Sequence, residues 1–343
     1  MKIGTIGSGT IVERFIQAIE MVNGVELVAV YSRSKAKAEA FAEKHNAKKA
    51  YVDIDEMLQD DEIDTIYVAS PNSLHYTQAL KALQAGKHVI DEKPFTSTLE
   101  ECDSLIRTAK ENGVFLFEAI TTLYLPNYKI IKENLKTIGN IHLVTCNFSQ
   151  FSSRYGKYIN HEQSNAFDPA FSGGALMDIN VYNVHFIVGL FGKPKNYQYF
   201  PNIGYNGIDT SGIMIMEYDN FIATLIGAKD SSSEYFCFIQ GDKASLKMSG
   251  ASTGVCKDVD IVPLKGDQIG ISNPVDSSNR ISIEQIMHMT YEVEAFRDII
   301  KNNETERYME LLQHTRDVME IISTSRIKAG IHFAADKKET ITK

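Results

Sequence analysis

The sequence predicts an α/β protein with two domains. Residues 1–122 are expected to form a doubly wound parallel sheet, and residues 123–343 an α+β domain with a large, mainly antiparallel, open-faced sheet. Three observations indicate this fold class. At 343 residues the chain exceeds one ordinary core. Its first third alternates short apolar runs with amphipathic stretches, whereas apolar runs follow one another without helices after residue 211.

The first third contains five strand-like runs separated by helical stretches. The strand-like runs are Lys2–Ile6, Val25–Tyr31, Thr65–Ala69, His88–Asp91 and Phe115–Glu118. The helical stretches are Ile11–Met21, Lys35–Lys44, His75–Gln84 and Leu99–Asn112. Strands that alternate with helices over short connections pair in parallel through right-handed crossovers. We therefore expect a doubly wound sheet here.

The pattern changes near residue 122. Helices are expected at Pro126–Leu135, Gly174–Leu190, Ser282–Lys301 and Glu304–Ala329. Strands are expected at Ile141–Phe151, Gly212–Tyr218, Phe221–Ala228, Tyr235–Gln240 and Ser245–Met248. Asp219-Asn220 and Gly241-Asp242 stand between apolar runs and are typical of hairpin turns. Strands joined by hairpins predict an antiparallel sheet.

Composition narrows the function classes. The net charge of −9 argues against nucleic acid as the main partner, because phosphate binding needs clustered Lys and Arg. The four cysteines show no zinc or disulfide spacing, so no metal site is expected. The first residues run straight into a strand-like segment without signal-peptide features, and no run approaches 18 apolar residues. We therefore expect a cytoplasmic protein without a membrane partner.

A glycine loop follows the first strand. In the segment Gly7-Ser8-Gly9-Thr10-Ile11-Val12, Gly7 permits a tight turn and Gly9 lets the backbone approach a pyrophosphate at the next helix's N-terminus. The third glycine position holds valine, so the fingerprint is incomplete, but the strand–loop–helix context is what the motif requires. This predicts a Rossmann dinucleotide site at Gly7, Gly9, Thr10 and Ile11.

The residues after the second strand favour NADP. An NAD-preferring site carries Asp or Glu there to hold the ribose hydroxyl. This chain has Ser32 and Arg33, followed by Lys37. A hydroxyl and a guanidinium suit a 2′-phosphate, because arginine offers a planar fork of donors to an anion. The alternative is an arginine on an exposed loop, and NAD stays possible.

Three further blocks follow in order: Ser70-Pro71-Asn72-Ser73-Leu74-His75, then Asp91-Glu92-Lys93-Pro94, then Gly173–Tyr182. With the glycine loop, they make nearly the whole chain resemble the glucose–fructose oxidoreductase, inositol dehydrogenase and MocA (Gfo/Idh/MocA) family. The residues Phe117–Ile120 and Tyr182 are most similar to the branch of dimeric dihydrodiol dehydrogenases and NADP-linked xylose dehydrogenases.

The resemblance implies roles for single residues. Lys93 is the implied catalytic lysine, Tyr182 the proton-transfer residue and Asp178 its neighbour facing the substrate. Cofactor contacts beyond the glycine loop are implied for Ser70, Asn72, His75, Glu92 and Lys93. A homodimer or higher homo-oligomer through the late sheet is implied as well. Three positions depart from the family pattern, with Ser172 and Asn180 where glycine is usual and His185 where Asp or Gln is frequent.

The chemistry agrees with these roles. A nicotinamide moves hydride, so another group must move the proton of the alcohol. A tyrosine pKa lies near 10, and a nearby ammonium lowers it, so we expect Lys93 to lower the pKa of Tyr182 and to stabilise the developing oxyanion. Asp178, Tyr182 and His185 are spaced to share one helix face. His185 is therefore a candidate substrate contact, and Tyr158 is another, because it lies in a polar loop that we expect beside the substrate cleft. The alternative makes Tyr182 a core residue and His185 a partner of backbone groups.

The predicted function is an NADP(H)-dependent oxidoreductase. It would transfer hydride between the nicotinamide and a carbonyl or hydroxyl of a small sugar, polyol, dihydrodiol or dicarbonyl. The alternative is a non-catalytic NAD(P)-sensing regulator on the same fold, which would need the glycine loop but not Lys93 or Tyr182. The sequence indicates neither which substrate reacts nor in which direction.

Overall fold

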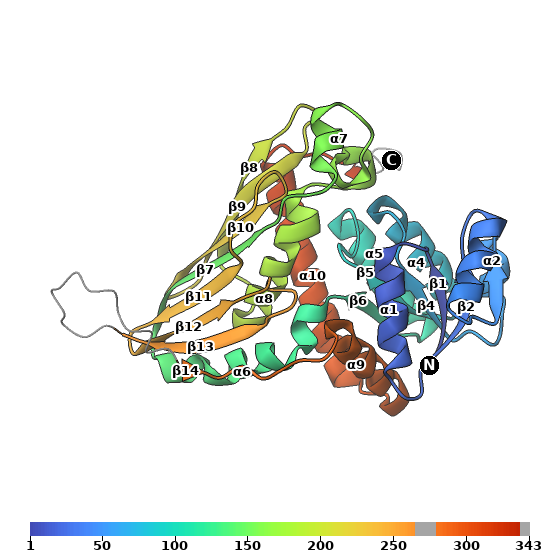
Figure 1. The fold of residues 1–343 in the computed structure, drawn as a ribbon, viewed down its shortest axis with the longest axis horizontal. Coiled ribbons are helices and arrows are strands. Elements are labelled where there is room, and N and C mark those ends of the chain that lie inside the picture. The colour runs from blue at the N-terminus through green and yellow to red at the C-terminus, as the bar shows by residue number, and fades with distance from the viewer. Residues whose placement is uncertain (265–278, 337–343) are drawn as a thin grey trace.

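Two β-sheets form the frame of the molecule, with helices between and around them (Figure 1). The structure is a computed structural model that describes residues 1–264 and 279–336. Residues 265–278 and 337–343 of the predicted second domain lie outside the described residues. The N-terminal unit comprises β1–β6 with α1–α5, and the C-terminal unit comprises α6–α10 with β7–β14.

The N-terminal unit is the predicted doubly wound sheet. Its six strands are parallel and stand in the order β3-β2-β1-β4-β5-β6. The strands are β1 (Lys2–Ile6), β2 (Glu26–Tyr31), β3 (Lys49–Tyr51), β4 (Thr65–Val68), β5 (His88–Glu92) and β6 (Leu116–Ala119). The helices are α1 (Thr10–Glu20), α2 (Lys35–Lys44), α3 (Ile54–Leu58), α4 (His75–Gln84) and α5 (Leu99–Asn112). The strand order reverses between β1 and β4, which places a ligand crevice at their carboxyl ends.

The C-terminal unit contains the predicted large sheet. Its eight strands stand in the order β14-β13-β12-β11-β7-β10-β9-β8, and only the β7–β10 pair is parallel. The strands are β7 (Ile141–Ser149), β8 (Asn196–Ile203), β9 (Asp209–Glu217), β10 (Ile222–Ala228), β11 (Phe236–Gly241), β12 (Ala244–Ser249), β13 (Asp258–Pro263) and β14 (Asn279–Arg280). Both predicted hairpins are present, between β9 and β10 and between β11 and β12.

Helices cover one face of this sheet. α6 (Pro126–Asn134), α8 (Val181–Phe191) and α10 (Thr305–Lys328) contact its strands. The unit also contains α7 (Tyr155–Ile159) and α9 (His288–Asn302), and α9 packs against α1. Figure 1 shows α8 and α10 on the side that faces the N-terminal unit. Along β9, Met214 and Met216 are buried whereas Ile213 and Ile215 are exposed. The opposite face is therefore open, as predicted.

The last two helices tie the units together. α9 packs against α1, and α10 packs against α5, β6 and α8. Two hydrogen bonds add to this joint, because Thr121 Oγ1 donates to the Gly254 carbonyl and Thr122 Oγ1 to that of Thr253. The loop around residue 254 is thereby held beside the end of β6, next to the site described below.

One helical stretch, Pro169–Phe191, is long and apolar enough to cross a membrane by length and composition. In the structure, 72% of its most apolar window is buried inside the protein. Its apolar side chains form part of the core under the large sheet. This stretch is therefore a core element.

Candidate active site

A groove runs along the carboxyl ends of β1, β2 and β4. Its volume is about 790 Å³. The predicted cofactor residues that line it are Gly7, Gly9, Ile11, Ser32, Arg33, Lys37, Ser70 and Asn72. Gly7 has a φ of +121°, and a Cβ there would lie 2.5 Å from the carbonyl oxygen of Ala69. Only glycine fits this turn. Thr10, in contrast, does not line the groove and is the exposed first residue of α1.

Three cations along the groove have no protein partner. Within the described residues, the side chains of Arg33, Lys37 and Arg154 make no hydrogen bond or ion pair, and all three line the groove. Arg154 comes from the C-terminal unit, just before α7, and sequence reasoning missed it. Unpaired guanidinium and ammonium groups beside a glycine turn fit the phosphates of a dinucleotide.

His75 and Glu92 lie behind the groove rather than in it, which corrects the expectation that they contact the cofactor. His75 is buried and its ring nitrogens lie 2.9 Å and 3.1 Å from the carbonyl oxygens of Ser70 and Pro94. Glu92 is buried, accepts a 2.5 Å hydrogen bond from the Tyr67 hydroxyl, and has its pKa raised to about 7 by burial. Both residues hold the loops that carry the site.

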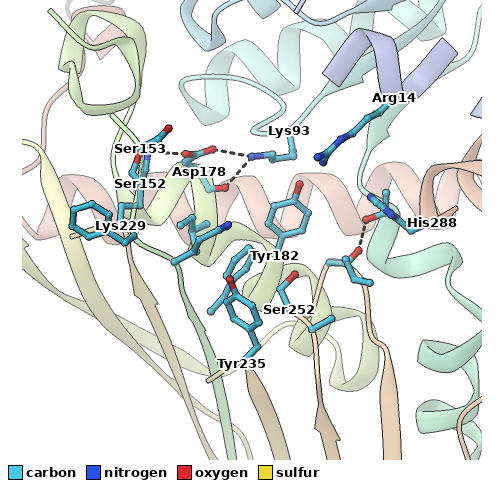
Figure 2. A pocket seen from close by; sticks show the side chains of 18 of the residues that line it. Arg14, Lys93, Ser152, Ser153, Asp178, Tyr182, Lys229, Tyr235, Ser252 and His288 are labelled. Atoms are coloured by element: carbon cyan, nitrogen blue, oxygen red, sulfur yellow. Dashed lines mark hydrogen bonds and ion pairs between the residues drawn. The ribbon is translucent and has the colours of Figure 1, made fainter. Parts of the chain in front are cut away.

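A second cavity, of about 630 Å³, opens where β5 meets the C-terminal unit (Figure 2). It brings together the three predicted catalytic residues. Lys93 directly follows β5, and its Nζ donates to Oδ1 and to the backbone oxygen of Asp178, both at 2.9 Å. The same Nζ lies 5.0 Å from the centroid of the Tyr182 ring. Lysine, carboxylate and phenol thus meet, although 89 positions separate Lys93 from Tyr182 in the sequence.

A second lysine completes the charge arrangement. Nζ of Lys229 lies 2.6 Å from Asp178 Oδ2 and donates to the carbonyl of Ala166 at 2.9 Å. Its side chain is only 1% exposed, and it directly follows β10. Burial opposes the charge on Asp178, but Lys93 and Lys229 outweigh burial and hold the pKa of this carboxyl well below its usual range. Asp178 therefore stays ionised between two ammonium groups.

The ammonium charge of Lys93 is stabilised by the same ion pair with Asp178. Burial disfavours its ammonium form, but the nearby Asp178 carboxylate more than compensates and raises the pKa of Lys93. Sequence reasoning found Lys93 and missed Lys229. The available signal was a lysine placed directly after a buried apolar strand, at Ala228–Lys229.

The position of Tyr182 depends on an irregular helix. Leu176–Asn180 forms a π-helical turn that continues into α8, and such turns are frequent at functional sites. The side-chain amides of Asn180 and Asn183 donate to the carbonyls of Leu225 and Ile226 in β10. The asparagine at 180, where the family usually has glycine, thus pins this turn to the sheet.

The ring of Tyr182 is also fitted tightly against Gly254. A Cβ at Gly254 would lie 2.8 Å from Cδ1 of the tyrosine ring. Burial raises the pKa of Tyr182 to about 12, although the Lys93 charge pulls it down. The expectation of a lowered pKa was therefore wrong, because desolvation outweighs the ammonium. The phenol is protonated at neutral pH and is suited to donate a proton.

His185 does not face this cavity, which corrects the expected substrate contact. It is fully buried, with Nε2 at 3.2 Å from Glu118 Oε1 and Nδ1 at 2.9 Å from Nε2 of His314 in α10. A step of three residues along an α-helix turns a side chain by about 60° from alignment. That rotation directs His185 toward β6 and α10 instead of the cavity.

Tyr158 is a structural residue as well. It is buried, its hydroxyl donates to Asn206 Oδ1 at 3.0 Å, and its ring stacks on Phe167 and Tyr205. It lines neither the groove nor the second cavity. The polar loop that suggested this contact is held by aromatic stacking, so the predicted substrate contact was wrong.

Comparison with known proteins decides the family. Residues 1–120 match "Oxidoreductase family, NAD-binding Rossmann fold", and residues 130–247 match "GFO/IDH/MocA C-terminal domain". The chain belongs to the Gfo/Idh/MocA oxidoreductase family. This confirms the resemblance drawn from the sequence, and with it an NAD(P)-dependent oxidoreductase on a Rossmann sheet joined to a mainly antiparallel sheet.

Relatives match along almost the full length. The scyllo-inositol 2-dehydrogenase (NADP(+)) IolU of Bacillus subtilis is 35% identical over 98% of this chain and 99% of its own. A trans-1,2-dihydrobenzene-1,2-diol dehydrogenase of Sus scrofa is 24% identical over 98% and 99%. Among solved structures, the 3-ketoreductase KijD10 of Actinomadura kijaniata, in complex with NADP and TDP-benzene, superposes with a TM-score of 0.82. It is 21% identical over 95% of this chain and 97% of its own, a likeness of fold alone.

Proposed function

We propose that this Gfo/Idh/MocA protein transfers hydride between NADP(H) and a carbonyl or hydroxyl carbon of a small sugar, polyol, dihydrodiol or dicarbonyl. One observation carries the proposal. Asp178 lines both the groove of the glycine loop and the cavity of Lys93 and Tyr182, so the two spaces meet at this residue. A dinucleotide in the groove would therefore end beside an ammonium and a phenol.

Tyr182, Lys93 and Asp178 have separate roles in the proposed reaction. A bound nicotinamide supplies or accepts the hydride. In the reducing direction the protonated Tyr182 donates its proton to the substrate oxygen, and the Lys93 ammonium stabilises the negative charge that develops there. Asp178 keeps Lys93 charged and in place. A regulator that only sensed the cofactor would need none of these three groups.

NADP is the proposed cofactor. Ser32, Arg33 and Lys37 line the groove at the end of β2, and among the described residues no carboxylate lines that end to hold a free ribose hydroxyl. The Bacillus subtilis relative is named for NADP(+), which supports the same choice.

A sugar-like substrate suits the second cavity. Hydroxyl and amide groups line it, from Gln150, Ser152, Ser153, Tyr235 and Ser252. Such groups pair with the hydroxyls of a polyol. The names of the relatives, an inositol dehydrogenase and a dihydrodiol dehydrogenase, describe substrates of this kind.

The test is NADPH consumption against a panel of ketoses, oxidised inositols and dicarbonyls. Lys93→Met should lower kcat by about 10²–10³-fold, because it removes one donor to the developing oxyanion. The affinity for NADPH should stay unchanged in a fluorescence titration, and Lys110→Met on the exposed surface of α5 should behave as wild type. A variant with wild-type kcat would refute the lysine's role. No consumption with any compound would favour the regulator.

A homodimer through the open sheet face is part of the proposal. Five apolar side chains on neighbouring strands lie exposed there: Leu143, Phe200, Ile213, Ile215 and Ile222. A contiguous apolar face marks an association surface, and two-fold pairing is the commonest solution. Ile213→Glu should convert the dimer to a monomer in sedimentation analysis. Val52→Glu, elsewhere on the surface, should not. A monomeric wild type would refute the dimer.

Two further expectations are proposed with it. The domains are residues 1–122 and 123–343, each built around its own sheet. The protein is cytoplasmic, in keeping with four buried cysteines that are all free thiols.

A further inference from the structure

Two residues that line the catalytic cavity have no role in the proposed hydride transfer. Arg14 of α1 and His288, the first residue of α9, both line the cavity of Lys93 and Tyr182. Figure 2 shows Arg14 and His288 on the side of Tyr182 that is remote from Asp178 and Lys229. Within the described part of the chain, neither side chain makes a hydrogen bond or an ion pair. The two residues come from different units and both face the cavity.

The cavity carries an excess of positive charge. The charged side chains among its described lining residues are Arg14, Lys93, Lys229 and Asp178. Asp178 is shared by the two lysines, so no carboxylate in the lining is left for Arg14. This excess stands in a protein whose net charge is −9. Like charges in a partly desolvated cavity repel one another, so an anion bound there gains attraction from all of them.

His288 adds a donor without adding a full charge. Burial and the neighbouring Arg14 guanidinium lower the pKa of His288, so its ring is neutral at physiological pH. A neutral imidazole still has one N–H to donate. The hydroxyl of Ser252 lines the same cavity. Arginine and imidazole thus supply donors for a planar or tetrahedral oxyanion.

We propose that Arg14 and His288 form a subsite for an anionic group of the substrate, a carboxylate or phosphate remote from the reacting carbon. This rests on the proposed hydride transfer and narrows its substrate class to acidic sugars and sugar phosphates. Arg14 lies in the catalytic cavity and not in the groove, where Arg33, Lys37 and Arg154 are available for the phosphates of the cofactor. The subsite therefore serves the substrate.

Matched substrate pairs test the subsite. Glucose, glucuronate and glucose 6-phosphate differ only at the carbon remote from the reacting end, and inositol and its monophosphate form a second series. Wild type should show a higher kcat/KM for an anionic member than for its neutral partner. Arg14→Gln should lower kcat/KM for the anionic member by about 10- to 100-fold, the usual effect of losing a hydrogen bond to a charged group, with less than about a 3-fold change for the neutral one.

Controls separate the subsite from other effects. Arg107→Gln removes the same charge from the exposed surface of α5 and should change nothing. Arg14→Lys should restore part of the preference, because charge returns without the fork. The carboxylate and phosphate arms show which anion is taken. Equal rates of wild type with neutral and anionic partners would overturn the proposal, as would a weaker affinity for NADPH in Arg14→Gln, which would make Arg14 a cofactor ligand.

The subsite has a readout that does not need turnover. With NADP⁺ bound, glucuronate or glucose 6-phosphate should raise the melting temperature of wild type, and not that of Arg14→Gln. If no compound is reduced or oxidised but this shift is present, the proposed hydride transfer fails while the anion subsite stands. If turnover occurs and neither the shift nor the preference is found, the subsite fails alone.

Discussion

The cofactor groove and the catalytic cavity meet at Asp178 but are built in opposite ways. Most of the groove consists of short segments at strand ends of the N-terminal unit, with a glycine turn, and its cations Arg33, Lys37 and Arg154 have no partner among the described residues. In the cavity, buried charges are paired with one another, as Lys229 is with Asp178. The N-terminal part of the groove is therefore a local property of the sequence, while the cavity, like the Arg154 side of the groove, is a product of tertiary packing. Changes in the groove should act on cofactor affinity, and changes in the cavity on kcat.

Tyr182→Phe is expected to show the largest difference between an effect on kcat and an effect on cofactor affinity. Losing the proton donor should lower kcat for reduction by about 10³-fold, within the range known for general acids, without weakening NADPH binding. Because the pKa of Tyr182 is about 12, the wild-type rate should stay level from pH 6 to pH 9 as far as this donor is concerned. Stopped-flow rates and NADPH fluorescence check both points. A wild-type rate that falls as pH rises, with an apparent pKa near 7, would contradict the assignment if Tyr182→Phe lacks this pH dependence.

A change in the groove should instead weaken cofactor binding and leave kcat almost unchanged. Arg33→Gln is expected to raise KM for NADPH by about 10- to 100-fold, since it removes a charged donor to the 2′-phosphate, while kcat at saturation changes little. KM for NADH should not change, which makes the unphosphorylated cofactor the internal control. Equal effects on the two cofactors would place Arg33 away from the 2′-phosphate.

A variant with a smaller expected effect tests whether packing fixes the position of the Tyr182 ring in the cavity. Gly254→Ala adds a Cβ that would lie 2.8 Å from the ring of Tyr182, so the ring must move. We expect kcat to fall about 10-fold, because small displacements of a reacting group are costly, with cofactor affinity unchanged. Gly156→Ala is the matched control, since a Cβ there meets nothing within 4 Å. Equal activities of the two variants would show that the ring tolerates displacement.

The smallest predicted effect is on thermal stability, and it comes from Glu92, which lies behind the groove. Glu92 has a pKa of about 7 in the folded protein and an ordinary value of 4.5, so the folded state binds the proton more tightly. Its contribution to stability is complete below pH 4.5 and is lost as pH rises to about 7. The melting temperature of Glu92→Gln relative to wild type should therefore rise between pH 5 and pH 8, by on the order of 5 °C. A difference independent of pH would contradict this.

The sequence predicted most of the N-terminal unit because its signals are local. Gly7 must be glycine for the turn, and β1 was placed with its observed bounds. The three-residue strand β3 was missed because three residues carry no periodicity, and β8 was missed because Phe200-Pro201 interrupts its alternation of polar and apolar residues. α9 begins at His288 rather than at the predicted Ser282, and the intervening residues have no regular secondary structure.

The cavity was predicted only where a motif marked it. Lys93, Asp178 and Tyr182 were found because they stand in blocks that resemble a family. Lys229 and Arg14 stand in no such block, and only folding brings them to the cavity. The raised pKa of Tyr182 also depends on burial, which is a tertiary property. Residue spacing on an ideal helix misplaced His185, because a rotation of about 60° turns that side chain toward α10.

The most direct measurement is a crystal structure of the wild-type protein with NADP⁺ and a slowly reacting polyol substrate. We expect one substrate oxygen within about 3.2 Å of both Lys93 Nζ and Tyr182 Oη, and its carbon within about 3.5 Å of the nicotinamide C4. A substrate oxygen held by other side chains, with the nicotinamide outside the cavity of Lys93 and Tyr182, would contradict the proposed function.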